Sequence, residues 1–347
     1  MKSLLENEAY LLCHIKAFGL PEMKTFGYNS KYNILIMELL GPSLENLFEK
    51  NNKKLSIKTS CMLGIQMIDR IEYIHSKKII HRDIKPDNFL IGRGNNSHIV
   101  YILDFGLSKK YWSSKKNKHI PFCTNKKLTG TARYASINAL SGCEQGRRDD
   151  LESIGYIIMY FILGNLPWQG LKVNKKEDRY IKIRDIKKAT SAKELCKGYP
   201  VQFENFINYT RNLKFMEVPD YEYLRNLLKD VIINCEHSNI DFFYDWCKTK
   251  PNIDKNNIIY TNNYDIEYDG DIDWLNRKYC LEENKNNGLD NFKNENNGKM
   301  NGNVYISKNN LIPEHSMNKV IKDSNNNFID EEKNNEFIYK DDMMDEN

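Results

Sequence analysis

The sequence of 347 residues contains little that would build a cross-linked, fibrous or membrane-spanning protein. Its eight cysteines include no Cys-x-x-Cys pair, which excludes the common zinc-ribbon and redox motifs. Glycine, with 18 residues, is too scarce for collagen, and no heptad pattern persists. The most apolar run, residues 154–166, is too short to span a bilayer. We therefore expect reduced thiols and a cytoplasmic protein, with the nucleus as a second location.

Charge is unevenly distributed along the chain. Residues 251–347 hold 11 Lys/Arg and 20 Asp/Glu, a net charge of −9, so the first 250 residues carry +13. Asn makes up 24 of those last 97 residues, and apolar residues are sparse, so we expect residues 249–347 to be mostly disordered. Trp274 and its neighbours are the tail's candidate for docking, although compositional drift is the favoured interpretation. The basic body is expected to bind phosphate, acidic peptide or nucleic acid.

Before residue 250 the hydrophobic pattern alternates between helical and extended periods. Apolar residues at helical spacing predict helices at 4–15, 55–75 and 150–163, and the last of these is apolar nearly all round, as in the middle of a core. Short apolar runs predict strands at 32–40, 79–80, 89–91 and 99–103. One helix, a strand pair and then a mainly helical body indicate an α+β protein with a small lobe on a large one.

The strongest chemical signal is the run His-Arg-Asp-Ile-Lys-Pro-Asp-Asn at residues 81–88, followed by Asp-Phe-Gly at 104–106. Phosphoryl transfer from ATP needs an oriented nucleophile and neutralised phosphate charge. Asp83 can accept the proton of a substrate hydroxyl, and Lys85 can reach the transferred phosphoryl group. Asn88 and Asp104 offer the hard oxygen ligands that Mg²⁺ prefers. Two chance charged turns would not match this pattern at so many positions.

At these residues the chain resembles a eukaryotic protein kinase of the casein kinase 1 family. Residues 130–138, Gly-Thr-Ala-Arg-Tyr-Ala-Ser-Ile-Asn, carry the Ser-Ile-Asn that this family has where most kinases have Ala-Pro-Glu. Further matches lie at 37–44, 147–153, 166–171, 220–224 and 244–246. The resemblance covers residues 3–248. It implies a two-lobe kinase fold with a small-lobe remnant at 1–40, a large lobe at 41–248 and a tail at 249–347.

The resemblance also implies ATP and Mg²⁺ as cofactors and assigns residues to the nucleotide. Met37 would be the gatekeeper beside the adenine, and the backbone of Glu38 and Leu40 would form the hinge hydrogen bonds. Asn46 stands where the family usually has an Asp near the ribose, and its amide can still hydrogen-bond a hydroxyl.

Two residues would support the catalytic loop rather than touch the nucleotide. Asp150 would hold the backbone of this loop from inside the large lobe, and Arg82 belongs to the loop itself. An ordinary helix N-cap before Leu151 is compatible with that role of Asp150.

Family substrates are Ser or Thr residues preceded by acidic or phosphorylated residues. Arg133 and Arg179 fall on the family's anion-site positions, with Gly170 nearby, and Arg179 replaces a Lys. Arginine suits bidentate phosphate binding, and the charge of +13 agrees independently. The expected partners are therefore acidic or phosphorylated proteins, with no specific nucleic acid, no membrane and a monomeric chain.

The sequence lacks two parts that an active kinase uses: a Gly-rich loop and a strand-borne Lys that clamps the ATP phosphates. Glu6 matches the ion-pair Glu of the first helix by its spacing to Tyr10, and Glu8 is the other candidate. Without earlier strands, the strand at 32–40 is expected to have an open edge. A truncated start is favoured over a degenerate kinase because the catalytic and metal residues are intact, and we expect the chain as written to transfer phosphate poorly.

Two rival functions follow from this absence and from the charge. A pseudokinase that binds partners through its large lobe is the alternative to an enzyme. A nucleic-acid-binding module rests on charge alone, without a recognition motif, and ranks far below.

Overall fold

The computed structural model describes residues 3–29, 31–173, 175–248 and 302–308, the last of these only in their backbone. The longer helices are α1 (Leu4–His14), α3 (Ile57–Ser76), α5 (Arg147–Leu163), α6 (Lys176–Ala189), α8 (Val201–Asn212) and α9 (Tyr221–Asp230). Shorter helices are α2 (Leu44–Lys50), α4 (Ile137–Leu140) and α7 (Ala192–Leu195), with 3₁₀ turns at Pro86–Asn88 and Gly94–Asn96 and a π turn at Val231–Cys235. The strands are β1 (Met23–Tyr28), β2 (Tyr32–Glu38), β3 (Ile79–Ile80), β4 (Phe89–Ile91), β5 (Val100–Ile102), β6 (Lys109–Lys110), β7 (Trp112–Ser113), β8 (Lys118–His119) and β9 (Gly302–Lys308).

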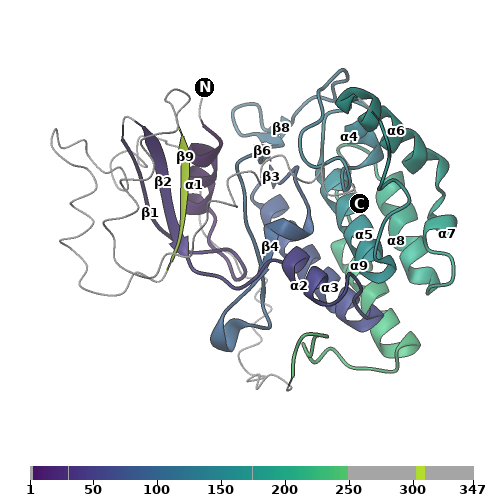
Figure 1. Ribbon diagram of the computed structural model, residues 1–347. Coiled ribbons are helices and arrows are strands. Elements are labelled where there is room, and N and C mark those ends of the chain that lie inside the picture. The colour runs from purple at the N-terminus through teal and green to yellow at the C-terminus, as the bar shows by residue number, and fades with distance from the viewer. Residues whose placement is uncertain (1–2, 30, 174, 249–301, 309–347) are drawn as a thin grey trace. The chain divides into compact units, whose positions relative to one another are not determined.

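The small lobe consists of α1 packed on an antiparallel sheet (Figure 1). The helix begins with a capping box in which the Ser3 hydroxyl accepts from the Glu6 amide and the Glu6 carboxylate accepts from the Ser3 amide. Strands β1 and β2 pair with Phe26 opposite Leu35, and both side chains are buried. Both side chains belong to the one hydrophobic core that also includes the buried residues of the large lobe.

The second edge of β2 differs from the expectation of an open edge. The sheet order is β1-β2-β9, so a strand from the tail is hydrogen-bonded along that edge (Figure 1). A strand edge offers unpaired backbone N–H and C=O groups, and a further strand satisfies them. The predicted docking segment around Trp274 lies outside the described residues.

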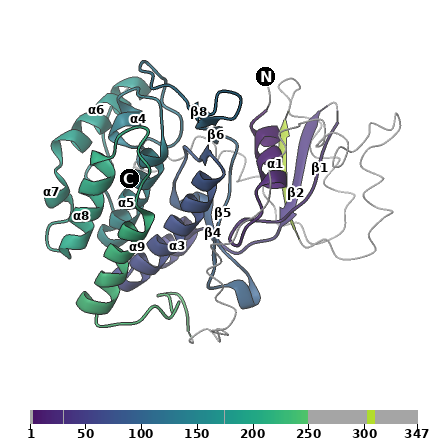
Figure 2. The same ribbon diagram turned by 180° about the vertical axis from the view of Figure 1, so that it is seen from behind.

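The large lobe is built around α5, with α3 and α8 packed against it and α9 packed on α3 (Figure 2). Residues 151–162 of α5 are all buried, as its apolar pattern predicts. Helix α3 matches the predicted helix closely, and its N-cap Ser56 accepts from the Thr59 amide. Strands β3, β4 and β5 lie where the short apolar runs predict them. No helix in the described ranges is long and apolar enough to cross a membrane.

The side chain of Asp245 joins the end of the large lobe to the start of α3. The Asp245 carboxylate accepts from the Ser56 amide at 2.6 Å, from the Ser56 hydroxyl at 2.7 Å and from the Thr59 hydroxyl at 2.8 Å. Beside it, the Tyr244 hydroxyl donates to the His98 carbonyl. Residues 189 positions apart in the chain thus share one helix terminus.

Candidate active site

Asp83 lies in the loop between β3 and β4 and is almost fully buried. Its Oδ1 accepts from both the amide and the hydroxyl of Thr131, each at 2.8 Å. Its Oδ2 lies 3.6 Å from the Lys85 ammonium. The Asn88 side chain donates to the Asp83 carbonyl at 2.9 Å, which holds the 3₁₀ turn against the loop. One carboxylate oxygen is therefore fixed in place, and the other faces a cation.

Asp104 follows β5 and has a left-handed backbone, with φ of 62°, a conformation that Asp tolerates. Its Oδ1 accepts from the Gly106 amide at 3.3 Å. The adjoining Leu103 amide donates to the Asn88 carbonyl at 2.9 Å, so the two predicted metal ligands lie on joined segments. Because the Asn88 amide nitrogen is already donating, its oxygen remains to act as a ligand. An amide oxygen and a carboxylate fit a hard cation such as Mg²⁺.

The two candidate acids of α1 have different surroundings. Glu6 caps its own helix at Ser3. Glu8 is buried, and its Oε1 accepts from the amides of Asp104 at 3.0 Å and Phe105 at 3.3 Å. Burial, and then the nearby Asp104 charge, raise the pKa of Glu8 to about 8. Of the two, Glu8 is the one that reaches the segment of Asp104, a predicted metal ligand.

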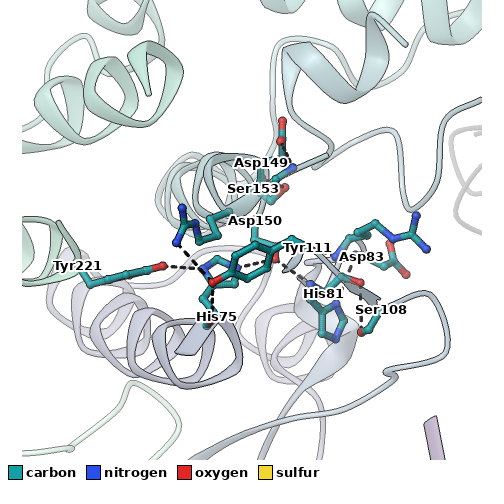
Figure 3. A network of polar contacts seen from close by, with 12 residues as sticks. His75, His81, Asp83, Ser108, Tyr111, Asp149, Asp150, Ser153 and Tyr221 are labelled. Atoms are coloured by element: carbon teal, nitrogen blue, oxygen red, sulfur yellow. Dashed lines mark hydrogen bonds and ion pairs between the residues drawn. The ribbon is translucent and has the colours of Figure 1, made fainter. Parts of the chain in front are cut away.

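Asp150 accepts three hydrogen bonds inside the large lobe: from the amides of His81 at 2.8 Å and Arg82 at 2.9 Å, and from the His75 ring at 2.9 Å. Figure 3 shows Asp150 beside His75 and His81. A carboxylate can only accept, so His75 donates through Nε2 and its Nδ1 accepts from the Tyr221 hydroxyl. This is the geometry required to hold the catalytic-loop backbone.

The charge states of His75 and Asp150 follow from the surroundings of each side chain. Burial lowers the pKa of His75, which keeps the ring neutral. Burial would raise the pKa of Asp150, but the hydrogen bonds from His75 and the Arg82 amide leave it lowered. The N-cap interpretation of Asp150 is wrong, because α5 begins at Arg147 and is capped at Gly146. The Asp149 side chain, not that of Asp150, accepts from the Gly146 amide.

The predicted nucleotide residues lie at the end of β2 and the start of α2. Met37 is fully buried and Leu40 nearly so. The Glu38 amide donates to the Glu22 carbonyl at 2.8 Å, so of its backbone groups only the carbonyl could serve as a hinge contact. Asn46 lies in the first turn of α2 with an exposed side chain.

Gly130 brings the next segment onto the catalytic loop. Its φ is 95°, and a Cβ at this position would lie 2.2 Å from the Arg82 carbonyl oxygen. Only glycine fits such an approach without moving the backbone. The approach places Thr131 on Asp83, a contact that sequence reasoning missed. The sequence could have indicated Thr131, because this residue lies in the same motif, residues 130–138, as Arg133.

Arg133 is half-buried, and its guanidinium lies over the rings of Tyr134 and Tyr160, 5.7 Å and 5.8 Å from their centroids. Its carbonyl accepts from the Trp168 ring N–H at 2.7 Å. Gly170 follows two residues after Trp168, and Arg179 lies on α6. The Arg133 backbone is thereby joined to the loop that leads to Gly170.

Glu45, on α2, is an acidic group near Arg133 that sequence reasoning did not single out. Its Oε1 accepts from the Tyr160 hydroxyl at 2.9 Å. Burial, and then the charge of Asp87, raise its pKa to about 7, while Arg133 acts in the opposite direction. The charge around Arg133 is therefore expected to change near neutral pH.

Comparison with known families gives a match that covers most of the chain. The protein kinase domain family matches residues 2–238. The match includes every residue of the site described above.

Proposed function

Because the chain belongs to the protein kinase family, we propose that it is a casein kinase 1-like serine/threonine kinase acting on acidic or pre-phosphorylated proteins. The observation that carries the kinase chemistry is the buried Asp83, with Oδ1 held by Thr131 and Oδ2 facing Lys85. This arrangement supports the proposal, because Asp83 would accept the proton of a substrate hydroxyl and the Lys85 ammonium beside it would stabilise the developing phosphate charge.

Asn88 and Asp104 would hold Mg²⁺, and the backbone of Glu38 and Leu40 would hold the adenine of ATP beside Met37. When bound, Mg²⁺-ATP supplies the phosphoryl group and neutralises part of its charge. The contribution of the chain is to fix these groups. Asp150 holds the loop amides, and the Asn88 side chain holds the Asp83 carbonyl.

The substrate class is inferred from Arg133, Arg179, Gly170 and the charge of the body. The first 250 residues carry +13, which favours acidic partners over basic ones. Arg133 is a half-buried guanidinium whose backbone is fixed by Trp168, and a fixed guanidinium can bind phosphate bidentately.

The test uses a chain given a Gly-rich loop and clamp Lys from a related kinase, and it compares peptides that differ only N-terminal to the target residue. A phosphoserine peptide should be the best substrate, an acidic peptide the next and a basic peptide poor, with rates falling as salt rises. Replacing both arginines, Arg133→Ala with Arg179→Ala, should lower kcat/KM for the phosphorylated peptide by about tenfold or more and change the unphosphorylated one little. Equal losses for both peptides, or a preference for basic peptides, would remove the substrate assignment. Phosphorylation of a tyrosine peptide alone would remove the serine/threonine assignment.

A protein-binding scaffold without catalysis is the second candidate, favoured by the surroundings of Glu8. Within the described residues no Lys or Arg forms an ion pair with this buried carboxyl, although an acid of this helix pairs with the ATP-clamp Lys in active kinases. Calorimetry of the full chain with Mg²⁺-ATP separates the candidates. Binding that requires Mg²⁺ supports the kinase, and absence of binding supports the scaffold.

A further inference from the structure

Lys187 lies fully inside the large lobe, although lysine is the side chain least often found there. It belongs to α6, whose Lys182 and Lys188 are exposed. Ile183, one turn earlier, is also buried, so Lys187 occupies the inward face of the helix. Burying a charge is costly unless the charge is paired and hydrogen-bonded, so the contacts of Lys187 identify its role.

The Lys187 ammonium donates to three backbone carbonyls of one short segment. The acceptors are Ala132 at 3.0 Å, Arg133 at 2.8 Å and Ala135 at 2.6 Å. An ammonium has three N–H donors, and here all of them are used. A neutral amine would offer two, so this set of acceptors favours the charged form even though burial lowers the pKa of Lys187.

Aromatic rings and one acid complete the surroundings of this cation. The Lys187 nitrogen lies 4.7 Å from the centroid of Tyr156 and 4.8 Å from that of Trp168. The buried carboxylate of Glu152 interacts with it electrostatically and favours its charge. Trp168 also donates to the Arg133 carbonyl, which thus accepts from two buried groups. The backbone at Arg133 is held more firmly than a turn exposed to solvent.

Residues 132–135, which Lys187 holds, adjoin one part of the site and contain another. Thr131, directly before them, donates twice to Asp83. Arg133, among them, bears the guanidinium assigned to the anionic group of the substrate. A substitution that left the carbonyls of residues 132–135 without a partner would favour movement of this segment, because an unpaired buried acceptor is costly.

We propose that Lys187 is a positioning residue for substrate selection: its ammonium holds the backbone of residues 132–135 so that the Arg133 guanidinium is presented to an anionic group N-terminal to the target residue. The identity of the group that Arg133 binds rests on the proposed function. The contact of the Lys187 ammonium with the backbone of residues 132–135 does not.

The first test measures the segment itself in the full 347-residue chain. Lys187→Met removes the three donors and keeps the length of the side chain. Lys188→Met is the matched control, since it removes the same charge from the adjacent, exposed position of α6. Amide hydrogen exchange at residues 131–136 should become about tenfold faster or more in Lys187→Met and stay unchanged in Lys188→Met. Equal exchange in the two variants would overturn the proposal.

The second test measures binding of a fluorescent phosphoserine peptide by anisotropy, which requires no turnover. Lys187→Met should weaken binding by about tenfold, as expected for loss of a hydrogen-bonded cation, and Lys188→Met by less than about twofold. If Lys187 acts through Arg133, the double variant Arg133→Ala with Lys187→Met binds no more weakly than Arg133→Ala alone. Losses that add would show an independent role and contradict the proposal.

If Lys187→Met does not fold, a second variant tests the same proposal. Lys187→Arg keeps the charge, but a planar guanidinium cannot aim three N–H groups at three carbonyls in this arrangement. Exchange at residues 131–136 should exceed that of Lys188→Arg, and no difference would overturn the proposal. If Arg133→Ala leaves the peptide affinity unchanged, the anion site of the proposed function fails, and the exchange data alone decide the role of Lys187.

Discussion

At the scale of single residues, the site consists of carboxylates whose roles are set by what each one accepts. Asp83 accepts from Thr131, Asp104 from Gly106 and Asp150 from the catalytic-loop amides. In the proposed function the same side-chain chemistry would serve proton transfer at Asp83 and metal binding at Asp104, and at Asp150 it holds the backbone. Substitution to Asn, which keeps the shape and removes the charge, separates these roles.

We predict that Asp83→Asn and Asp104→Asn fail in different ways. Asp83→Asn should keep Mg²⁺-ATP binding and, in a chain given a Gly-rich loop and clamp Lys from a related kinase, lower phosphoryl transfer by at least about 10²-fold, because only the proton acceptor is lost. Asp104→Asn should weaken Mg²⁺-dependent binding itself, because a charged metal ligand is lost. Calorimetry and a peptide kinase assay measure the two effects. Asp185→Asn, an exposed change on α6, is the control. Normal turnover in either site variant would contradict the assignment.

Glu45 gives a prediction about pH. Its pKa is raised from an ordinary 4.5 to about 7, so unfolding releases a proton between these values and stability falls as pH rises from 4.5 through 7. Glu45→Gln cannot titrate. Its melting temperature should therefore rise relative to the natural chain between pH 4.5 and pH 8, by several degrees, since one pKa unit is worth about 1.4 kcal/mol and one kcal/mol about 2–4 °C.

The Gln amide at position 45 keeps an acceptor for the Tyr160 hydroxyl. Any cost of its unpaired N–H groups is the same at every pH, so the change with pH is the decisive measurement. A melting-temperature difference that stays constant from pH 4.5 to pH 8 would show that Glu45 does not titrate in this range.

At the scale of elements, the start of α3 depends on a residue at the far end of the lobe. Asp245→Ala removes the acceptor of the Ser56 amide and of two hydroxyls. The carboxylate is exposed, so we expect a loss typical of a helix cap, about 1 kcal/mol, and a melting temperature lower by about 2–4 °C. Asp245→Asn, which retains one oxygen, should lose less. Equal losses in both variants would mean that the charge alone matters.

Elements that depend on local pattern were predictable from the sequence. The apolar periodicity of α3 and α5, and the short runs of β4 and β5, match the structure to within a few residues. The hairpin of β7 and β8 was not predicted, because two-residue strands in a lysine-rich segment leave no periodic signal. Hydrophobic periodicity predicts which side chains are buried. It does not identify the residues against which they pack.

The same limit applies to the site. Residues within one motif, such as Asp83 and Asn88, could be assigned because their spacing is local. The contact of Thr131 with Asp83 spans 48 positions, and that of Lys187 with Arg133 spans 54. Such pairs depend on how α5 and α6 bring distant segments together, which no local pattern specifies. The pairing of β9 with β2 is a contact of the same kind.

At the scale of the whole molecule, the tail is expected to act on the small lobe and not on the large one. Because β9 is hydrogen-bonded to β2, deleting residues 302–308 should speed amide exchange along β2. The melting transition of the large lobe should move by no more than about 2–4 °C, the effect of one kcal/mol. Deleting seven residues at 286–292 is the control. Unchanged exchange in β2 would show that the strand does not pair in solution.

The shared terminus of Asp245 and Ser56 has a consequence for synthesis on the ribosome. The Ser56 amide, at the start of α3, cannot reach its Asp245 acceptor until a residue 189 positions later has been made, a delay of about 10–40 s at 5–20 residues per second. During that interval the Ser56 amide and the hydroxyls of Ser56 and Thr59 lack their acceptor on Asp245. Chains arrested before residue 245 should be cut by protease near residue 56, and chains arrested well beyond it, with Asp245 clear of the exit tunnel, should resist. The acceptor that the start of α3 needs is therefore supplied only near the end of the domain's synthesis.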